Sequence, residues 1–335
     1  QDKERESDFL RYRYNFQGTT VSRELRQLVP EIIFGSANVG PGGIGFNSVT
    51  RLEDSYTAGF ENTQAYLQFD AQITPEVRLS LGGRYEDSTL STNSFNVIGA
   101  PVLGLEETGR FLPATTLTYE FAENMQVRAA YSRTLSRPDL RELSPARFLD
   151  DERDIDVRGN PNLITSTLDN FDLRWEWYFS EGQQATIGVF YKDIANPIEQ
   201  VFTVVADELL LTYLNGEGGE VYGIEAEIET YLPAEDWFGS FFAERDLFFK
   251  ANASYIDSDI TSDTSNNQNL VTDLQHRLQG QSRYLFNSQI GWENLDTGET
   301  VALLFNYTGP RISDLGIAGA GNIIERAFYG LDFTY

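Results

Sequence analysis

The sequence contains no cysteine and only one histidine among its 335 residues. Without cysteine, the chain cannot form disulfide bonds, thiolate nucleophiles or cysteine-ligated zinc sites. The single histidine, His276, could serve a hydrolase only if the fold placed it beside a nucleophilic serine. A histidine at the end of a loop is more often a solvated polar residue, which is the interpretation adopted for His276. Neither enzyme activity nor a bound cofactor is therefore expected.

Basic residues are also scarce. The chain has 25 Lys and Arg against 51 Asp and Glu, a formal net charge of −26. Nucleic-acid binding is not expected of such a chain, because that binding requires a basic surface that displaces counterions from phosphate. No run of about 18 apolar residues occurs, which excludes helical membrane spans. The first residues, Gln1 to Glu6, lack the basic and apolar regions of a secretion signal, so processing or truncation is expected to have removed what preceded them.

Aromatic residues are abundant, with 23 Phe, 17 Tyr and 4 Trp, and they suit strands and membrane interfaces. Many lie in stretches where apolar and polar residues alternate for about ten positions. From Phe171 to Phe179, apolar side chains occupy the odd positions, while Asp172, Arg174 and Glu176 occupy even ones. This period-2 pattern recurs along the chain and predicts strands with one apolar and one polar face. Charge is nearly absent from the apolar face, as expected of a membrane β-barrel whose apolar face meets lipid.

The pattern predicts twelve antiparallel strands, at residues 8–16, 62–74, 77–88, 109–121, 125–135, 166–179, 184–195, 219–232, 247–257, 277–293, 300–310 and 326–335. Short turns alternate with long segments at 17–61, 89–108, 136–165, 196–218, 258–276 and 311–325. Short turns at one end and long loops at the other are typical of outer-membrane barrels. The connection at 233–246 is longer than the short turn expected there.

Several motifs follow one another along these strands. They are Tyr131 to Pro145 with its Arg137-Pro138 pair, Gly159-Asn160-Pro161-Asn162-Leu163, Asp169-Asn170-Phe171, Asn215-Gly216 with Tyr222-Gly223-Ile224-Glu225, and Leu278 to Asn287. In this order the motifs resemble those of the TonB-dependent receptors, over about residues 62–335. One departure is Thr165-Ser166, which stands where that family usually has a Pro-Glu pair.

The resemblance implies an all-β, antiparallel transmembrane β-barrel, with the whole of residues 1–335 forming one barrel segment. Such receptors have 22-stranded, plugged barrels. It follows that the plug and about eight strands should precede Gln1, and two strands should follow Tyr335. The ending Gly330 to Tyr335 also resembles the aromatic terminal signal of a complete outer-membrane protein, but truncation is the interpretation preferred here.

Four residues are candidate ligand contacts. Arg133, Arg137 and Arg141 are expected near the external mouth, where guanidinium groups could bind an anionic ferric chelate. Tyr178 is expected to face inward and could stack on a ligand. The alternative is that the arginines hydrogen-bond the barrel wall and that Tyr178 belongs to an interfacial aromatic belt with Trp175, Trp177, Trp237 and Trp292. The acidic run from Asp150 to Asp156 could bind calcium, but its spacing is not that of an EF-hand and a solvated loop is preferred.

The favoured function is uptake of a scarce, bulky nutrient across the Gram-negative outer membrane, with a ferric chelate as the first substrate to consider. Its expected partners are outer-membrane lipid, a small-molecule ligand and, through the missing plug, the TonB complex. A passive outer-membrane pore and an outer-membrane hydrolase remain as alternatives.

Overall fold

The computed structural model describes residues 2–8, 10, 12–16, 27–40, 43–96, 98–150, 153, 155–205, 208–263, 271–294 and 296–335. Within these residues, twelve antiparallel strands follow one another in a single sheet, and the short strand β16 (Gln275–His276) pairs with β15. In order of pairing, the twelve are β1 (Asp2–Asp8), β4 (Ser55–Thr74), β5 (Val77–Phe95), β6 (Pro101–Ala122), β7 (Met125–Ser136), β10 (Ser166–Ser180), β11 (Gln183–Ala195), β14 (Gly218–Leu232), β15 (Asp246–Thr261), β17 (Tyr284–Asn294), β18 (Glu299–Thr308) and β21 (Phe328–Thr334). The predicted all-β fold of about twelve antiparallel strands is confirmed.

Four hairpins lie in the connections between the long strands. They are β2 (Tyr12–Phe16) with β3 (Ile44–Ser48), β8 (Arg147–Asp150) with β9 (Ile155–Arg158), β12 (Ile198–Val205) with β13 (Glu208–Asn215), and β19 (Arg311–Asp314) with β20 (Ile323–Glu325). The helical elements are α1 (Pro30–Ile33), η2 (Leu52–Asp54), α2 (Ala234–Phe238) and η3 (Ser240–Phe242). In the described ranges, no helix has the length and apolar character needed to cross a membrane.

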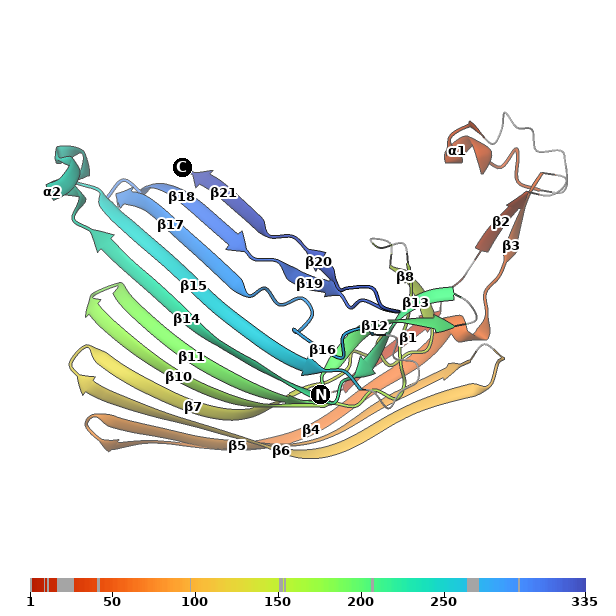
Figure 1. The fold of residues 1–335 in the computed structure, drawn as a ribbon, viewed down its shortest axis with the longest axis horizontal. Coiled ribbons are helices and arrows are strands. Elements are labelled where there is room, and N and C mark those ends of the chain that lie inside the picture. Colours follow the sequence, from red (N-terminus) through yellow and green to blue (C-terminus); the bar gives the residue numbers. More distant parts are fainter. Residues whose placement is uncertain are drawn as a thin grey trace. The chain divides into compact units, whose positions relative to one another are not determined.

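The chain divides into two compact units. Unit 1 comprises residues 1–61, 89–106 and 140–162, and unit 2 comprises residues 62–88, 107–139 and 163–335. Unit 1 has a small apolar cluster in which Tyr56, Ala58 and Ala146 are buried with Leu140 packed against them. Unit 2 contains the long strands from β7 to β21, which Figure 1 shows side by side.

Several predicted boundaries are wrong. The strand expected at 8–16 is two separate strands, since β1 pairs with β4 while β2 pairs with β3. The long loop expected at 89–108 is mostly strand, because β5 continues to Phe95 and β6 begins at Pro101. The strand expected at 277–293 begins only at Tyr284. Gly280 precedes it with a φ of 74°, a left-handed conformation that interrupts a strand.

The register of unit 2 aligns the apolar positions of neighbouring strands into rows. One row runs from Ala129 through Leu173, Val189, Ile224 and Tyr255 to Tyr284. The next runs from Val127 through Trp175, Ile187, Ala226, Ala253, Phe286 and Tyr307 to Tyr329. We call this side of the sheet the apolar face and the opposite side the polar face. Much of the apolar face is uncovered, as Leu173 illustrates with 48% of its surface exposed.

The two ends of the unit 2 strands differ. At the turn end, connections of two to four residues join β6 to β7, β10 to β11 and β17 to β18. At the loop end, longer connections carry the hairpins, and β12, β13, β19 and their neighbours bury a local core of Val201, Leu214, Val271, Ile312 and Leu315. The loop end therefore has apolar packing of its own, apart from the apolar face.

Candidate functional site: the polar face of the sheet

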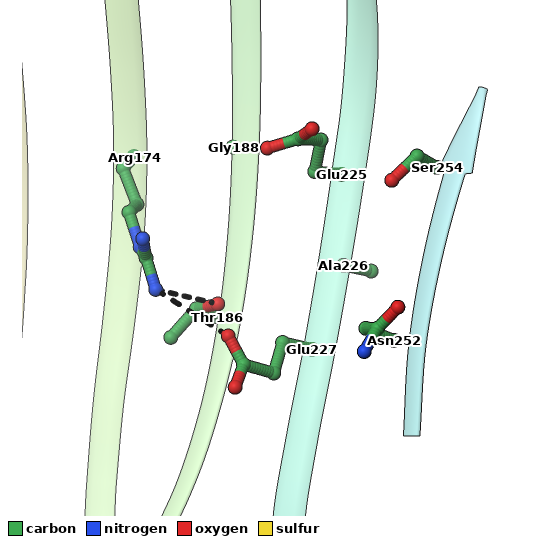
Figure 2. Close-up of a pocket in the computed structure, with 8 residues that line it drawn as sticks. All are labelled: Arg174, Thr186, Gly188, Glu225, Ala226, Glu227, Asn252 and Ser254. Carbon is green, nitrogen blue, oxygen red and sulfur yellow. Dashed lines mark hydrogen bonds and ion pairs between the residues drawn. The ribbon is translucent and has the colours of Figure 1, made fainter. Parts of the chain in front are cut away.

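A shallow pocket of about 260 Å³ lies on the polar face across β10, β11, β14 and β15. Its lining includes Arg174, Thr186, Gly188, Glu225, Glu227, Asn252 and Ser254, which Figure 2 shows. The register explains the hollow, because Arg174 lies opposite Gly188 and Gly188 lies opposite Glu225. Gly188 contributes no side chain between the two charged residues, and the space there stays open.

Charged and amide groups surround this hollow. The Arg174 guanidinium donates a hydrogen bond to Thr186 Oγ1 at 3.2 Å and lies 3.7 Å from the Glu227 carboxylate. Glu225 extends toward Gly188 in Figure 2, while Asn252 and Ser254 approach from β15. Such a surface offers one guanidinium, two carboxylates, hydroxyls and an amide. It can therefore hydrogen-bond a polar partner or hold water.

Glu176 is the centre of the adjoining polar network. Its side chain is 4% exposed, and both Arg128 and Arg174 lie within ion-pair distance, at 3.5 and 3.4 Å. Tyr178 donates its hydroxyl to Glu176 Oε2 at 2.9 Å, and the Gln126 amide also contacts this oxygen. The network fixes four side chains from β7 and β10 around one carboxylate.

The four predicted ligand contacts do not form one cluster. Tyr178 belongs to the Glu176 network. Arg133 pairs with Asp169 at 2.9 Å and leaves β7 on the side of Tyr131, which is the apolar face. Arg137 pairs with the buried Glu86 of β5. Arg141 belongs to unit 1, where its guanidinium lies 3.4 Å from the centre of the Phe148 ring. Their ligand contacts stay predictions.

Sequence reasoning assigned Arg174 and Glu176 to the polar side of their strand but did not single them out. Their importance depends on partners in other strands, such as Arg128 and Glu227. Alternation identifies the face of a strand, whereas only the register identifies its neighbours. The one sequence signal for the hollow is Gly188, a glycine inside a strand pattern.

Residues 4–329 match the model of the family described as "TonB dependent receptor-like, beta-barrel". The chain belongs to the TonB-dependent receptor family. Membership of this family explains the motifs that suggested the resemblance. The barrel fold class predicted from those motifs is confirmed.

Solved structures similar to this receptor chain include a siderophore receptor, a copper transporter and an import receptor. The siderophore receptor PiuA from Acinetobacter baumannii has a TM-score of 0.61 and 17% identity, over 88% of this chain and 38% of PiuA. The copper transporter OprC has a TM-score of 0.58 and 13% identity, over 86% and 40%. The ferric-catecholate import receptor Fiu from E. coli K12 has a TM-score of 0.57 and 15% identity, over 88% and 40%.

At these identities the similarity to solved structures shows the fold alone, and the chain spans about two fifths of their length. No curated protein sequence matches this chain. Family membership places the chain among receptors and transporters rather than in an enzyme class.

In this TonB-dependent receptor, His276 is buried at the loop end, so its expected position as a solvated residue is wrong. Its Nε2 lies 3.0 Å from Ser262 Oγ and 3.1 Å from Glu199 Oε1, and its Nδ1 contacts the Arg277 carbonyl oxygen at 3.0 Å. A hydrolytic triad instead places the carboxylate on Nδ1 and the serine on Nε2. Ser262 is 1% exposed and also donates to Glu199, so the cluster fits a structural contact better than a nucleophile.

The environment of His276 favours its charged form. Burial opposes protonation, but the Glu199 hydrogen bond, the Arg277 carbonyl and the negative charges of Glu199 and Asp273 outweigh it. The pKa of His276 is consequently raised above its ordinary value. A protonated His276 donates to Glu199 and ties β12 to β16.

The acidic run from Asp150 to Asp156 lies partly outside the described residues. In the part described, Asp156 is 3.9 Å from Arg147 and Asp150 is 3.8 Å from Arg153. Among the residues that the structure describes, no group of three or more His, Asp or Glu side chains gathers where it could hold a metal ion.

Proposed function

We propose that this chain forms part of the wall of a TonB-dependent receptor that imports a bulky, scarce nutrient across the Gram-negative outer membrane. The observation that carries the proposal is the family match over residues 4–329. It coincides with a sheet whose two faces differ sharply in polarity, which is the construction of a membrane-spanning barrel wall. A ferric chelate is the first substrate to test.

The apolar face is assigned to lipid in this proposal. Leu173, Val189 and Ile224 lie in one row of that face, and each has more than two fifths of its surface exposed. Leaving a large aliphatic side chain fully exposed to water costs about 1.5–3 kcal/mol relative to burial, and these side chains, a little under half exposed, retain part of that cost. Hydrocarbon removes that penalty, while the polar face with its pocket then lines the lumen.

A plug domain and the coupling to the TonB complex belong to the same proposal. This part of the proposal is supported by the coverage, because the chain spans only 38–40% of the three solved relatives. We place a plug elsewhere in the same polypeptide and assign the polar face as the surface against which it packs. The Glu176 network and the Figure 2 pocket supply hydrogen-bonding groups for that contact.

Iron uptake by the full-length protein tests the proposal. We would express it in a Gram-negative host that lacks its own ferric-chelate receptors and measure uptake of radioactive iron bound to catecholate and hydroxamate chelators. Uptake that requires TonB supports the proposal. Uptake that persists without TonB would favour the passive pore, and no uptake of any chelate would remove the ferric-chelate assignment.

The predicted ligand contacts are tested in the same assay. Arg137→Ala and Arg141→Ala should raise the substrate concentration that gives half-maximal uptake, because an anionic ligand loses a guanidinium partner. Arg78→Ala is the matched control, since Arg78 pairs with Asp70 near the turn end of β5. Equal values for all three variants would remove the two arginines from the binding site.

A further inference from the structure

Three connections at the loop end of unit 2 are fastened to one another. They are the β11–β14 connection, which carries the β12–β13 hairpin, the β15–β17 connection, and the β18–β21 connection, which carries β19. The parts in contact are residues 198–205 and 208–215, residues 271–283, and residues 311–317. We call these residues the loop block. Figure 1 shows its strands β12, β13, β16 and β19 at the loop end.

Side chains join the β15–β17 connection to the hairpin. The Gln279 amide accepts a hydrogen bond from the Gln200 backbone N–H at 3.2 Å and donates one to the Gln200 carbonyl oxygen at 3.0 Å. An amide that pairs with both backbone groups of one residue repeats the pattern of a β-ladder. His276 contacts Glu199, the neighbouring residue of β12, at 3.1 Å. The two connections are therefore attached at consecutive residues of β12.

Backbone hydrogen bonds join the same β15–β17 connection to the β18–β21 connection. The Thr272 N–H donates to the Gly316 carbonyl oxygen at 2.7 Å, and the Gly280 N–H donates to the Ile312 carbonyl oxygen at 2.9 Å. These two bonds lie at the two ends of the segment from Thr272 to Gly280. The segment is therefore held along its length, with the hairpin attached between the two bonds.

A shared apolar core lies among the three connections. Val201 and Leu214 come from the hairpin, Val271 comes from the β15–β17 connection, and Ile312 and Leu315 come from the β18–β21 connection. Each of the five has at most 8% of its surface exposed. Moving one connection away would bring these side chains into water and break the hydrogen bonds in the same step. Segments that share their packing and hydrogen bonds in this way open cooperatively.

We infer that the loop block is a single conformational unit, which opens and closes as a whole. None of its three connections can serve as a separate lid, because each is bonded to the β15–β17 connection or contains it, and all three share one core. Opening of the loop end then displaces all three connections together. The external position of the loop block rests on the proposed function, whereas its cooperativity does not.

Hydrogen exchange of the full-length receptor in lipid vesicles tests the loop block, read by mass spectrometry of peptides from each connection. Gln279→Ala removes both hydrogen bonds to Gln200. Exchange should accelerate by the same factor, roughly tenfold, in the hairpin, around Thr272 and around Ile312, because one opening reaction exposes them all. Acceleration confined to β12 would overturn the inference, since the hairpin would then open alone.

Gln72→Ala is the matched control for Gln279→Ala. The Gln72 amide donates to the carbonyl oxygens of Thr74 and Pro75, so both bonds lie at the turn between β4 and β5. Exchange should change at that turn and not in the loop block. Acceleration of the loop block in this variant would attribute the response to global unfolding and would count against a separate unit.

A disulfide within the loop block tests its role in uptake. Val271 and Ile317 form an antiparallel bridge, which brings their Cα atoms within disulfide range. This chain has no cysteine, so Val271→Cys and Ile317→Cys can be combined once any cysteines elsewhere in the receptor are replaced by serine. Uptake with the disulfide formed should match uptake after reduction within about twofold, because a bond inside one unit restrains nothing that moves. Uptake that is lost on oxidation and returns on reduction would overturn the inference, since two connections would then have to separate.

The two measurements separate this inference from the proposed function, because hydrogen exchange does not depend on the substrate. If the reduced protein imports none of the ferric chelates, the proposed function fails. Equal or unequal acceleration across the three connections still decides whether the loop block opens as one unit.

Discussion

At the scale of the single residue, Glu176 carries the largest share of the polar network. Replacing its carboxylate in Glu176→Gln leaves Arg128 and Arg174 without their common anionic partner. We expect the variant to lose about 1–3 kcal/mol of stability, the cost of leaving buried polar groups poorly satisfied. Urea-induced unfolding of the full-length receptor in lipid vesicles, followed by tryptophan fluorescence, measures this loss.

Asp172→Asn is the matched control for Glu176→Gln, because Asp172 lies on the same face of β10 and is exposed. Its unfolding curve should move by no more than about 0.5 kcal/mol, as is usual for surface substitutions. If the two variants were equally stable, Glu176 would not organise the network.

For some individual residues, the sequence identifies a pattern but not the surroundings that explain it. The glycine of the Gly-Asn-Pro motif is part of the family resemblance in the sequence, and the structure gives a physical reason for it, which is packing. A Cβ on Gly159 would lie 2.2 Å from the Ser144 carbonyl oxygen and 2.5 Å from that of Glu142, closer than atoms can approach. His276 was assigned to solvent because a sequence does not reveal which distant carboxylate, here Glu199, will be folded against it.

At the scale of the strand, alternation located the strands where one face is apolar and the other polar. Alternation did not locate the parts of a strand in which both faces carry polar side chains. The last residues of β5, from Thr89 to Phe95, are mainly polar on both sides, yet they remain paired because the hydrogen-bond ladder does not depend on side-chain polarity. A period-2 pattern therefore predicts the apolar band of a strand better than its full length.

The apolar face can be tested at a single row. Arg at Leu173 would place a charge among Ala129, Val189 and their row neighbours, and should cost about 2–4 kcal/mol near the bilayer midplane. Arg at Asp172, one residue away on the polar face, should be much milder. Folding of the full-length protein into vesicles, followed by heat-modifiable mobility on gels, measures both. Similar losses for both variants would contradict the assignment of the faces.

The hairpin of β12 and β13 should respond to pH. The raised pKa of His276 means that the folded loop holds the proton more tightly than the unfolded loop does. The contact with Glu199 is thus fully effective below the ordinary pKa of 6.5 and weakens as the pH rises through the folded value. Hydrogen exchange of the hairpin amides, corrected for the intrinsic effect of pH, should show protection that decreases in this direction.

His276→Gln removes the titrating group but keeps a side chain that can hydrogen-bond Glu199 or Ser262. Protection of the hairpin in this variant should be lower at acidic pH than in the natural sequence and nearly independent of pH. A pH response that survives the substitution would assign the effect to a group other than His276.

At the scale of the whole molecule, each strand of the main sheet is hydrogen-bonded to the next in an order that begins at β1 and ends at β21. Exposed edges at the two ends of such a path leave backbone N–H and C=O groups unpaired, and each costs roughly several kcal/mol in hydrocarbon. We therefore expect the 335-residue chain, refolded alone in detergent and in bilayers, to aggregate rather than form a conducting barrel. Gel mobility before and after heating, together with channel conductance, checks this. A stable monomer with reproducible conductance would contradict it and would support the passive pore.

Hydrogen bonds at the base of the β12–β13 hairpin determine which residues of this region can change during evolution. Asn215 donates to the carbonyl oxygens of Ile164 and Asn196 at 3.0 and 2.9 Å and accepts from the Ile164 amide at 2.9 Å. The Gly216 amide closes the same base on Pro197 at 2.7 Å. Because the ends of the hairpin are held together below it, residues inserted or exchanged farther along do not shift the strands on either side. Evolution can therefore vary the hairpin residues that do not pack into the loop-end core, sparing Glu199, Val201 and Leu214, while the strands on either side keep their register.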